Sequence, residues 1–443
     1  MTFGRQDFCD GISRRGLIKA GLGGFIGLSM ADLLRLQADS AAHNSRPDTA
    51  VIFLELAGGP TQHETYDPKP NAPQEYRGPL RAIQTNVPGI QLSEFMAEQA
   101  RVMDKIAVIR SIHHDSGSHG TSSHLTQTGY YLQDRQNRAN EKPCIGSVTA
   151  RVRGANASGM PAFVSIPTAM RYGNASYFGQ GYNPYQTGSY SSSVANFRAR
   201  NLSLIGGMSM DRLDNRRSLL ASFDEGRRIV DNENLGEAMD QFNQQAFEMV
   251  TGDRAREAFD LSSEDERTRQ RYGMERRGMG QGALLARRLV ERGVTFVTVR
   301  MNTNGSWDDH NGIANRMRAK GPHYDLAVAA LVEDLHQRGL ARKVMVVAMG
   351  EFGRTPRVNR NAGRDHWGRV MSVMVAGGGL RTGQAIGASD SKGATPADQP
   401  YRPENVLAMV YRHLGIDPAT TFPDPTGRPR YLLEERELIR ELI

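Results

Sequence analysis

The sequence predicts an α/β protein of three layers, with a mostly parallel central sheet between two layers of helices. Short apolar and β-branched runs alternate with helical patterns, which is typical of a parallel sheet. The clearest run, residues 343–349 (K-V-M-V-V-A-M), is apolar nearly throughout, as expected for a strand buried on both faces. Polar loops follow four of the strands, and open α/β sheets bind ligands at the carboxyl ends of their strands.

The remaining elements follow from the same patterns. Strands are expected at residues 51–57, 105–111, 160–167, 294–300, 343–349 and 372–376, and helices at residues 92–103, 323–338 and 403–414. The charged stretch 210–292 is expected to be helical with solvated arginine faces. We find no internal repeat and no second domain boundary, so residues 43–443 are expected to form one domain.

Length and charge limit the classes of function. A chain of 443 residues with 39% hydrophobic content is long enough for one large α/β domain. The formal charge of +7 is mild, and the basic residues are dispersed rather than gathered in one stripe, so we expect no nucleic-acid partner. Of the two cysteines, Cys144 lies outside the N-terminal segment, so the mature chain has one thiol and no internal disulfide.

The N-terminal segment has the features of an export signal. Residues 13–19 (S-R-R-G-L-I-K) resemble the twin-arginine motif, and the apolar segment 20–30 that follows is too short to span a bilayer. Small residues at 40–42 offer a cleavage site. We therefore predict a signal peptide at residues 1–42, the twin-arginine translocase as a partner, a periplasmic or secreted protein, and no stable membrane span in the mature chain. The alternative is an ordinary amphipathic helix.

The loop after the strand 343–349 is the first candidate site. Residues 350–369 read G-E-F-G-R-T-P-R-V-N-R-N-A-G-R-D-H-W-G-R. Glu351, Asp365 and His366 are of the types that bind metal ions, and the guanidinium of Arg354 suits a tetrahedral oxyanion. The alternative is a solvated loop with internal salt bridges.

Two further loops follow the first two expected strands. Residues 58–67 contain His63 and Glu64 as candidate metal ligands and Thr65 as a candidate nucleophile, although turn chemistry explains the same residues. Residues 113–124 contain four of the 11 histidines. Such crowding is hard to attribute to packing because each buried imidazole needs a partner. We favour His114 and His119.

The fourth loop, residues 304–312, contains Asp308, Asp309 and His310 just after an expected strand. If the strands are parallel neighbours, all four loops open on one edge of the sheet and converge. Two divalent ions (zinc, manganese or calcium) held by Asp, Glu and His would polarise a phosphoryl or sulfuryl oxygen and activate a hydroxyl or water. Arg354 would bind the remaining oxygens of the substrate.

Several long motifs resemble one bacterial family. They are G-G-P-T-Q-H-E-T-Y-D-P-K-P, the W-D-D-H loop, G-E-F-G-R-T-P, G-R-D-H-W and G-G-G-L-R-T-G-Q-A-I-G. They resemble the family numbered fifteen-oh-one among the domains of unknown function, and the likeness covers nearly the whole mature chain. That family resembles a divergent branch of the alkaline phosphatase and sulfatase superfamily, and its members commonly have twin-arginine leaders. The resemblance implies an alkaline phosphatase-like α/β/α fold with a two-metal site.

The resemblance also implies roles for particular residues. Asp308 or Asp309 together with His310 resembles the pair that binds one metal, and His366 resembles the last histidine ligand. His119 occupies the place of the modified cysteine of sulfatases. The chain departs from the superfamily at Ala57-Gly58, where a metal-binding Asp is expected, and it lacks C-x-P-x-R. The nucleophile stays open between the hydroxyls of Thr65, Ser118 and Thr121, a phosphorylated His119, and an activated water.

These observations lead to two hypotheses of different classes. The first is an exported, metal-dependent hydrolase of phosphate or sulfate esters, on a small molecule or a polysaccharide. The second is a non-catalytic metal- or glycan-binding protein on the same fold. A third, a structural export protein without metal, requires that the four loops do not converge.

Overall fold

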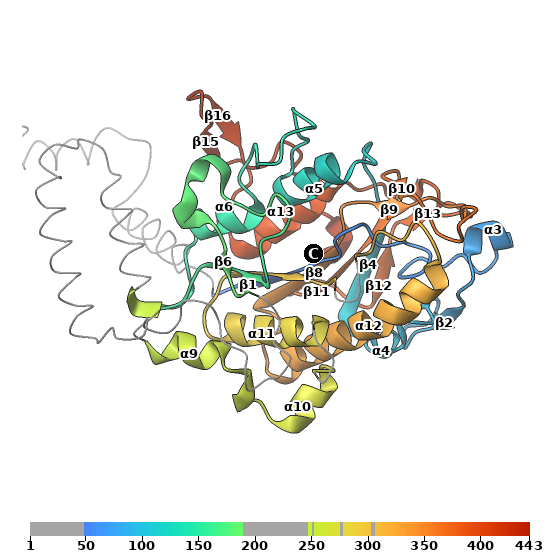
Figure 1. Ribbon diagram of the computed structural model, residues 1–443, viewed down its shortest axis with the longest axis horizontal. Coiled ribbons are helices and arrows are strands. Elements are labelled where there is room, and N and C mark those ends of the chain that lie inside the picture. The colour runs from blue at the N-terminus through green and yellow to red at the C-terminus, as the bar shows by residue number, and fades with distance from the viewer. Residues whose placement is uncertain (1–47, 189–246, 250–251, 275–277, 303–305) are drawn as a thin grey trace, which may run out of the picture. The chain divides into compact units, whose positions relative to one another are not determined.

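The computed structural model describes residues 48–443 with four gaps, at residues 189–246, 250–251, 275–277 and 303–305 (Figure 1). The expected signal peptide, residues 1–42, and the part of the charged stretch from 210 to 246 lie outside the described residues.

An eight-stranded sheet forms the centre, in the order β12-β4-β11-β8-β1-β7-β5-β6. Its strands are β1 (Ala50–Glu55), β4 (Ile106–Ile112), β5 (Phe163–Ile166), β6 (Tyr185–Gln186), β7 (Phe296–Arg300), β8 (Val344–Met349), β11 (Met371–Gly377) and β12 (Gln384–Ile386). Strand β11 runs antiparallel to both neighbours, β4 and β8, and the other pairs are parallel. This arrangement confirms the mostly parallel sheet.

Alternate residues of the strands enter two separate hydrophobic cores. In β1, Ile52 and Leu54 belong to one core, and Val51 and Phe53 belong to the other. Because successive side chains of a strand point to opposite faces, an apolar run of this kind requires cover on both sides of the sheet. All six residues of β1 are buried, as are all six of β8.

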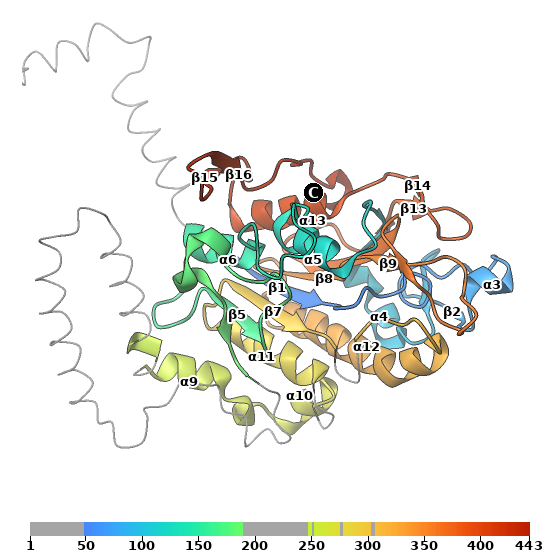
Figure 2. The same cartoon turned by 45° about the horizontal axis from the view of Figure 1, so that its top comes forward.

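Helices provide that cover and complete three layers (Figures 1 and 2). One face packs against α11 (Met279–Glu291), α12 (Ile313–Gln337) and α4 (Ala97–Arg101). The other packs against α5 (His119–Thr128), α6 (Ile145–Val152) and α13 (Pro403–Leu414). The predicted three-layer α/β/α architecture is confirmed.

Smaller elements decorate this body. The short helices are α3 (Gln74–Arg77), α9 (Asp253–Phe259) and α10 (Glu266–Arg271), with 3-10 turns at Met103–Lys105, Ser176–Phe178, Gln180–Tyr182, Leu261–Ser263 and Arg440–Leu442. Four two-stranded sheets pair β2 (Ala82–Gln84) with β3 (Gln91–Ser93), β9 (Gly353–Arg354) with β10 (His366–Trp367), β13 (Ala388–Ser389) with β14 (Pro396–Asp398), and β15 (Thr421–Pro423) with β16 (Pro429–Tyr431).

The predicted strands all exist, with shifted ends, and the helix predicted at 403–414 coincides with α13. Two helix predictions were wrong in part. Residues 91–93 form strand β3, because Leu92 pairs with Ile83 across a hairpin and is buried there. Helix α12 begins at Ile313, ten residues before the expected start, and continues through Pro322. Proline usually ends a helix, so the sequence pattern placed the boundary after it. Among the described helices, none is both long and apolar enough to cross a membrane.

Candidate metal centre

The four polar loops converge at the carboxyl edge of the sheet, as the sequence predicted. The Gly58 amide, just beyond β1, donates hydrogen bonds of 2.9 and 3.0 Å to the two oxygens of Glu351, just beyond β8. His119, the first residue of α5, lies 2.7 Å from the same carboxylate. Arg354 contacts Asp308, from the loop after β7, at 2.5 Å. The third hypothesis, a structural protein without metal, required that the loops stay apart, and it is therefore excluded.

Glycine is required where two of these loops cross. Gly58 has a φ of +110°, and a Cβ atom there would lie 2.5 Å from the Asp308 backbone nitrogen. Only glycine adopts this conformation readily and allows so close an approach. The Ala57-Gly58 sequence, where the resemblance leads one to expect an Asp, thus brings the Asp308 backbone against the end of β1. The carboxylate beside that end comes from Glu351 instead.

Three imidazoles surround the carboxylate of Asp308. The Nε2 atoms of His310 and His366 each lie 3.0 Å from Asp308 Oδ1 and 3.0 Å from each other. The Nε2 atom of His119 lies 3.3 Å from Asp308 Oδ2. The side chains of His119, Asp308 and His366 are 25–30% exposed, so a ligand can approach the group from solvent.

The other nitrogen of each ring is held by an acceptor. His119 Nδ1 faces Glu351 Oε1, His310 Nδ1 faces Asp365 Oδ1 at 2.8 Å, and His366 Nδ1 faces the Gly117 carbonyl at 2.9 Å. Carboxylates and carbonyls only accept hydrogen bonds, so each Nδ1 carries the proton. In the neutral ring the Nε2 lone pair then points toward Asp308. Metal-binding histidines are oriented by partners of this kind.

This donor set fits a divalent metal ion. Lone pairs on His310 Nε2, His366 Nε2 and Asp308 Oδ1 face one another at 3.0 Å, which is repulsive unless a cation or a ring proton lies between them. The ligands of one tetrahedral ion lie roughly 3.3 Å apart, given bonds of about 2.0–2.1 Å. His119, Asp308 and His366 are also the group that, within the described part of the chain, meets the spacing of a metal site.

Charges around the group act on its pKa values. Burial acts to raise the pKa of Asp308, but the hydrogen bond and charge of Arg354 outweigh it, so the pKa lies well below its usual range. The hydrogen bond to Glu351 raises the pKa of His119. The hydrogen bond from His310 lowers the pKa of Asp365. All three carboxylates near the group are therefore accounted for as acceptors, and one guanidinium offsets part of their charge.

Seven of the predicted residues come together here: His119, Asp308, His310, Glu351, Arg354, Asp365 and His366. Their geometry gives these residues different roles. The carboxylates of Glu351 and Asp365 hold the Nδ1 side of two rings, away from the Nε2 atoms that face Asp308. The sequence left open whether Asp365 binds metal or orients a histidine, and in the structure it contacts His310 Nδ1.

Arg354 is bound to acceptors of the protein, whereas the sequence suggested that it binds a substrate oxyanion. Its side chain is fully buried, and its guanidinium donates to the carbonyls of Gly58, Gly59 and Arg364 as well as to Asp308. All its nitrogens are engaged with the protein, so none is left to bind a substrate oxyanion. Instead, the guanidinium of Arg354 joins three loops and holds Asp308.

The predicted residues of the first loop lie outside the cluster. Glu64 is fully buried and paired with Arg364, with an Nη2–Oε1 distance of 2.8 Å. His63 Nε2 lies 2.9 Å from the Lys392 carbonyl, and the hydroxyl of Thr65 donates to the Thr61 carbonyl at 2.6 Å. These bonds fix the fold of the loop. Both candidate ligands and the candidate nucleophile are therefore engaged with other partners.

His114 and Asp309 also lie apart from the Nε2 atoms. His114 is buried, and its Nε2 lies 2.8 Å from the backbone carbonyl of Glu351. Asp309 is buried against Lys320 of α12, at 2.6 Å. Adjacent residues of a loop point in different directions, so the sequence D-D-H could not show which aspartate faces the site.

Sequence reasoning missed two residues that shape the group. The buried ring of Phe352 lies beneath His119 and His366, with centroid distances of 5.0 and 4.5 Å. The Asn359 amide donates to the His310 carbonyl at 3.0 Å and to Asp365 Oδ1 at 3.2 Å, and its oxygen accepts from the amides of Asn361 and Gly363. The N-R-N-A-G sequence signals a turn, but not what that turn supports.

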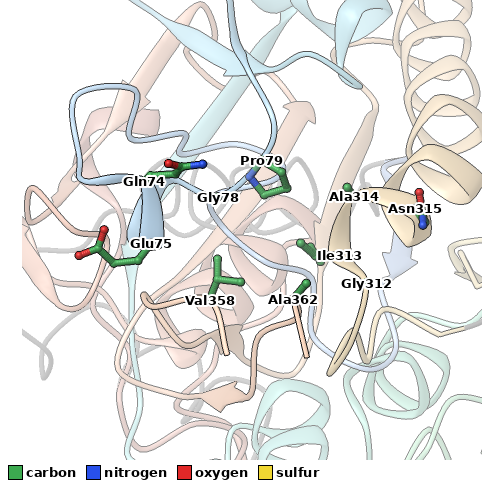
Figure 3. Close-up of a pocket in the computed structure, with 10 residues that line it drawn as sticks. All are labelled: Gln74, Glu75, Gly78, Pro79, Gly312, Ile313, Ala314, Asn315, Val358 and Ala362. Carbon is green, nitrogen blue, oxygen red and sulfur yellow. The ribbon is translucent and has the colours of Figure 1, made fainter. Parts of the chain in front are cut away.

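A pocket of about 590 Å³ is lined by residues that are close in sequence to those of the histidine cluster (Figure 3). Its lining residues come from the α3 segment, the start of α12 and the loop before Asp365: Gln74, Glu75, Gly78, Pro79, Gly312, Ile313, Ala314, Asn315, Val358 and Ala362. No residue of the histidine cluster lines it. It is a neighbouring feature, connected to the cluster through the His310–Gly312 and Ala362–Asp365 segments.

The chain belongs to the family described as "Protein of unknown function (DUF1501)", which matches residues 48–443. A search of curated proteins found no match. The family assignment agrees with the motifs that the sequence shares with it.

Solved structures with some likeness to this chain include one that is described as a sulfatase. One is described as Ps i-CgsB in complex with k-i-k-neocarrahexaose, with 9% identity, 83% of this chain and 72% of that chain covered, and a TM-score of 0.36. A protein of Bacteroides thetaiotaomicron, described with the metabolism of glycosaminoglycans, has 11% identity, 83% and 73% coverage, and a TM-score of 0.38. The PsFucS1 sulfatase from Pseudoalteromonas sp. has 10% identity, 87% and 70% coverage, and a TM-score of 0.31.

Asn359 gives the first testable prediction. Replacing it with Ala removes the hydrogen bonds that hold the His310 backbone and Asp365, so we expect zinc affinity to fall about tenfold or more. Isothermal titration calorimetry with zinc, on protein stripped of metal, measures the change. Asn86→Ala is the matched control, because the exposed Asn86 amide likewise donates to a carboxylate, that of Asp104 before the start of β4, and its loss should leave zinc affinity unchanged. Equal affinities of Asn359→Ala and wild type would contradict the assignment.

His63 predicts how stability depends on pH. Burial, with the charge of Arg364, lowers the pKa of His63 from 6.5 to about 4. Between these values the unfolded chain takes up a proton and the folded protein does not, so stability is lost as pH falls from 6.5 to 4. A shift of this size costs about 3 kcal/mol at the acid end.

The variant His63→Gln, which keeps an N–H donor for the Lys392 carbonyl, should lose less stability over that window than the wild type. Urea unfolding of both proteins in the presence of a chelator, at pH 4.5 and 7, measures the difference. A wild-type curve with the same pH dependence as the variant would show that His63 is not held neutral.

Proposed function

We propose that this protein is an exported, metal-dependent hydrolase of phosphate or sulfate esters, acting on a small-molecule or polysaccharide substrate. The observation that carries the proposal is the convergence of three Nε2 atoms on Asp308, with every Nδ1 held by an acceptor. Export is proposed from the motif at residues 13–19. The chain's membership of its family over residues 48–443, together with the resemblance of that family to a branch of the alkaline phosphatase and sulfatase superfamily, supports the reaction class.

The donor set bears on the identity and the number of the metal ions. Three imidazole nitrogens with one carboxylate suit zinc or manganese, whereas calcium prefers a shell of oxygens. The sequence suggested two ions, but His63, Glu64, His114 and Asp309 have other partners. We therefore propose one zinc or manganese ion, held by Asp308 with His119, His310 and His366.

Such an ion would act as a Lewis acid toward an ester oxygen and activate an attacking group. The chain's own residues prepare the site for it. Glu351 and Asp365 orient two rings, and Arg354 keeps Asp308 ionised. Phe352 forms an apolar floor beneath two of the imidazoles, which excludes water from that side. Thr65 is buried with its hydroxyl engaged, so a water or the exposed Ser118 is the better nucleophile.

Arg171 is the residue we propose for the substrate's anionic oxygens, in place of Arg354. Its side chain is exposed, and it forms no ion pair with any described residue. It lies beside the first turn of α5, where a Cβ built on Gly120 would be 3.6 Å from its Nη2 atom. Gly120 follows His119 directly. A free guanidinium next to the cluster suits the bidentate binding of a phosphate or sulfate group.

The metal itself is the first prediction to test. Residues 43–443 purified without chelator should contain about one equivalent of zinc or manganese by elemental analysis. The double variant His310→Ala/His366→Ala should contain none, and Asn86→Ala, which changes an exposed residue away from the cluster, should keep it. No metal in the wild type, and none taken up when zinc or manganese is added to folded protein, would overturn the proposal.

Turnover separates the hydrolase from the second hypothesis, a non-catalytic metal- or glycan-binding protein. A panel of phosphate monoesters, phosphate diesters and sulfate esters should reveal metal-dependent hydrolysis that His366→Ala abolishes. Arg171→Ala should raise KM at least fivefold while retaining metal, because it removes substrate binding only. A metal-loaded protein without activity on any of these esters would favour the binding protein instead.

A further inference from the structure

The pocket of about 590 Å³ shown in Figure 3 is bounded by three segments of the chain. They are the α3 segment at residues 74–79, the start of α12 at residues 312–315, and the loop that contains Val358 and Ala362. We call this the α3–α12 pocket. Its volume lies within the range of about 300–1,000 Å³ that is typical of small-molecule sites. None of the histidine cluster lines it, so the proposed reaction leaves the pocket without a role.

The lining of the pocket is mainly apolar. Half of the lining residues have apolar side chains, namely Pro79, Ile313, Ala314, Val358 and Ala362. Glycines add backbone to the wall, and Glu75 is the one charged residue in the lining. A ligand therefore gains free energy by placing an apolar ring or a short chain in this pocket.

Backbone hydrogen bonds join the three segments that form the walls. The Val358 amide donates to the Glu75 carbonyl at 2.8 Å, which ties the loop to α3. The Ile313 amide donates to the Ala362 carbonyl at 2.8 Å, which ties the same loop to the start of α12. The walls are thus held together before any ligand binds, and this limits the ordering that binding would cost.

Four arginines lie in or beside the segments that bound the pocket. They are exposed and form no ion pair with any residue that the structure describes: Arg77, Arg318, Arg357 and Arg360. The Arg318 guanidinium donates to Oδ1 of the lining residue Asn315 at 3.2 Å, so it lies at the rim. Arg77 and Arg357 each adjoin a lining residue in the chain, which places their Cα atoms about 3.8 Å from its own. Side chains of this length reach the rim from there.

Carboxylates near the pocket are fewer. Glu75 is exposed and forms no ion pair with any residue in the described ranges. On the neighbouring segments, Glu64 and Asp309 are each buried in an ion pair with a cation of their own, and Asp365 accepts a hydrogen bond from a ring of the cluster. The rim therefore has an excess of positive charge.

We propose that the α3–α12 pocket binds a small amphiphilic anion, which is an apolar ring or short chain that bears a carboxylate, sulfate or sulfonate group. The apolar part fills the pocket. The anionic group lies at the rim, where a guanidinium binds such a group with two parallel hydrogen bonds. This site is additional to the histidine cluster, and the proposal does not rest on the proposed function.

Other kinds of ligand fit the pocket less well. A cationic molecule would have Glu75 as its partner, but it would be repelled by the more numerous arginines of the rim. A neutral apolar molecule would fill the pocket and leave the guanidiniums without a partner. The sign of the charge effect therefore separates the proposed ligand from both alternatives.

Anilinonaphthalene sulfonate, an amphiphilic anion, is the probe that tests the pocket. Isothermal titration calorimetry on residues 43–443 should show one saturable site of micromolar affinity. Ala314→Trp fills the pocket and should weaken binding at least tenfold. Ala319→Trp is the matched control, because it places the same side chain at an exposed position of α12 outside the lining and should bind like the wild type. Circular dichroism melting curves confirm that the variants are folded.

Charge variants test the rim with the same probe. Arg318→Gln/Arg357→Gln should weaken binding about threefold or more, whereas Glu75→Gln, which removes a repulsive charge, should tighten it. Arg267→Gln, which removes an exposed charge on α10, should have no effect. The neutral analogue N-phenylnaphthylamine should bind less tightly than the sulfonate.

The variant His366→Ala separates this site from the histidine cluster, since it should lose metal and still bind the sulfonate like the wild type. Wild-type affinity in Ala314→Trp would overturn the proposal, because the probe would then bind elsewhere. Tighter binding of the neutral analogue than of the sulfonate would also overturn it, as would weaker binding of the sulfonate to Glu75→Gln than to the wild type.

Discussion

The carboxylate of Asp308 is the point on which the rest of the site depends. Its Oδ1 atom contacts Arg354, His310 and His366, and its Oδ2 atom faces His119. A half-buried charge of this kind is stable only if it is paired, and Arg354 supplies the pair while also binding carbonyls of the loop after β1 and of its own loop. The same charge that attracts the imidazoles therefore fixes the loops that carry them.

The direction of β11 explains how one connection supplies both sides of the site. Strand β8 ends at the edge where the loops converge, and β11 runs the opposite way beside it, so β11 begins at that edge. The long loop between them thus has both ends at the site. Glu351 leaves from β8, His366 lies just before β11, and the antiparallel pair of β9 and β10 closes the loop on itself. A fully parallel order would have carried the chain away to the other edge.

Several charged residues of the loops form the frame of the site rather than the site. Glu64 with Arg364, and Asp309 with Lys320, are buried pairs that tie the loops to one another and to α12. Breaking such a pair leaves one charge buried and unpaired, which is costly. Polar residues at strand ends therefore either form the site or stabilise the loops around it, and residue type alone does not show which.

By itself, the sequence determined the layered fold and the edge at which the site lies. The apolar run that became β8 and the periodic pattern of α13 are local signals, and polar loops after such strands must open on the carboxyl edge of a parallel sheet. Only the tertiary structure decided which side chains meet there. Whether Asp308 or Asp309 turns inward depends on Lys320, eleven residues further on, and whether Arg354 binds a substrate or the protein depends on carbonyls nearly 300 residues away. Such choices are made by contacts between distant segments, which no local pattern records.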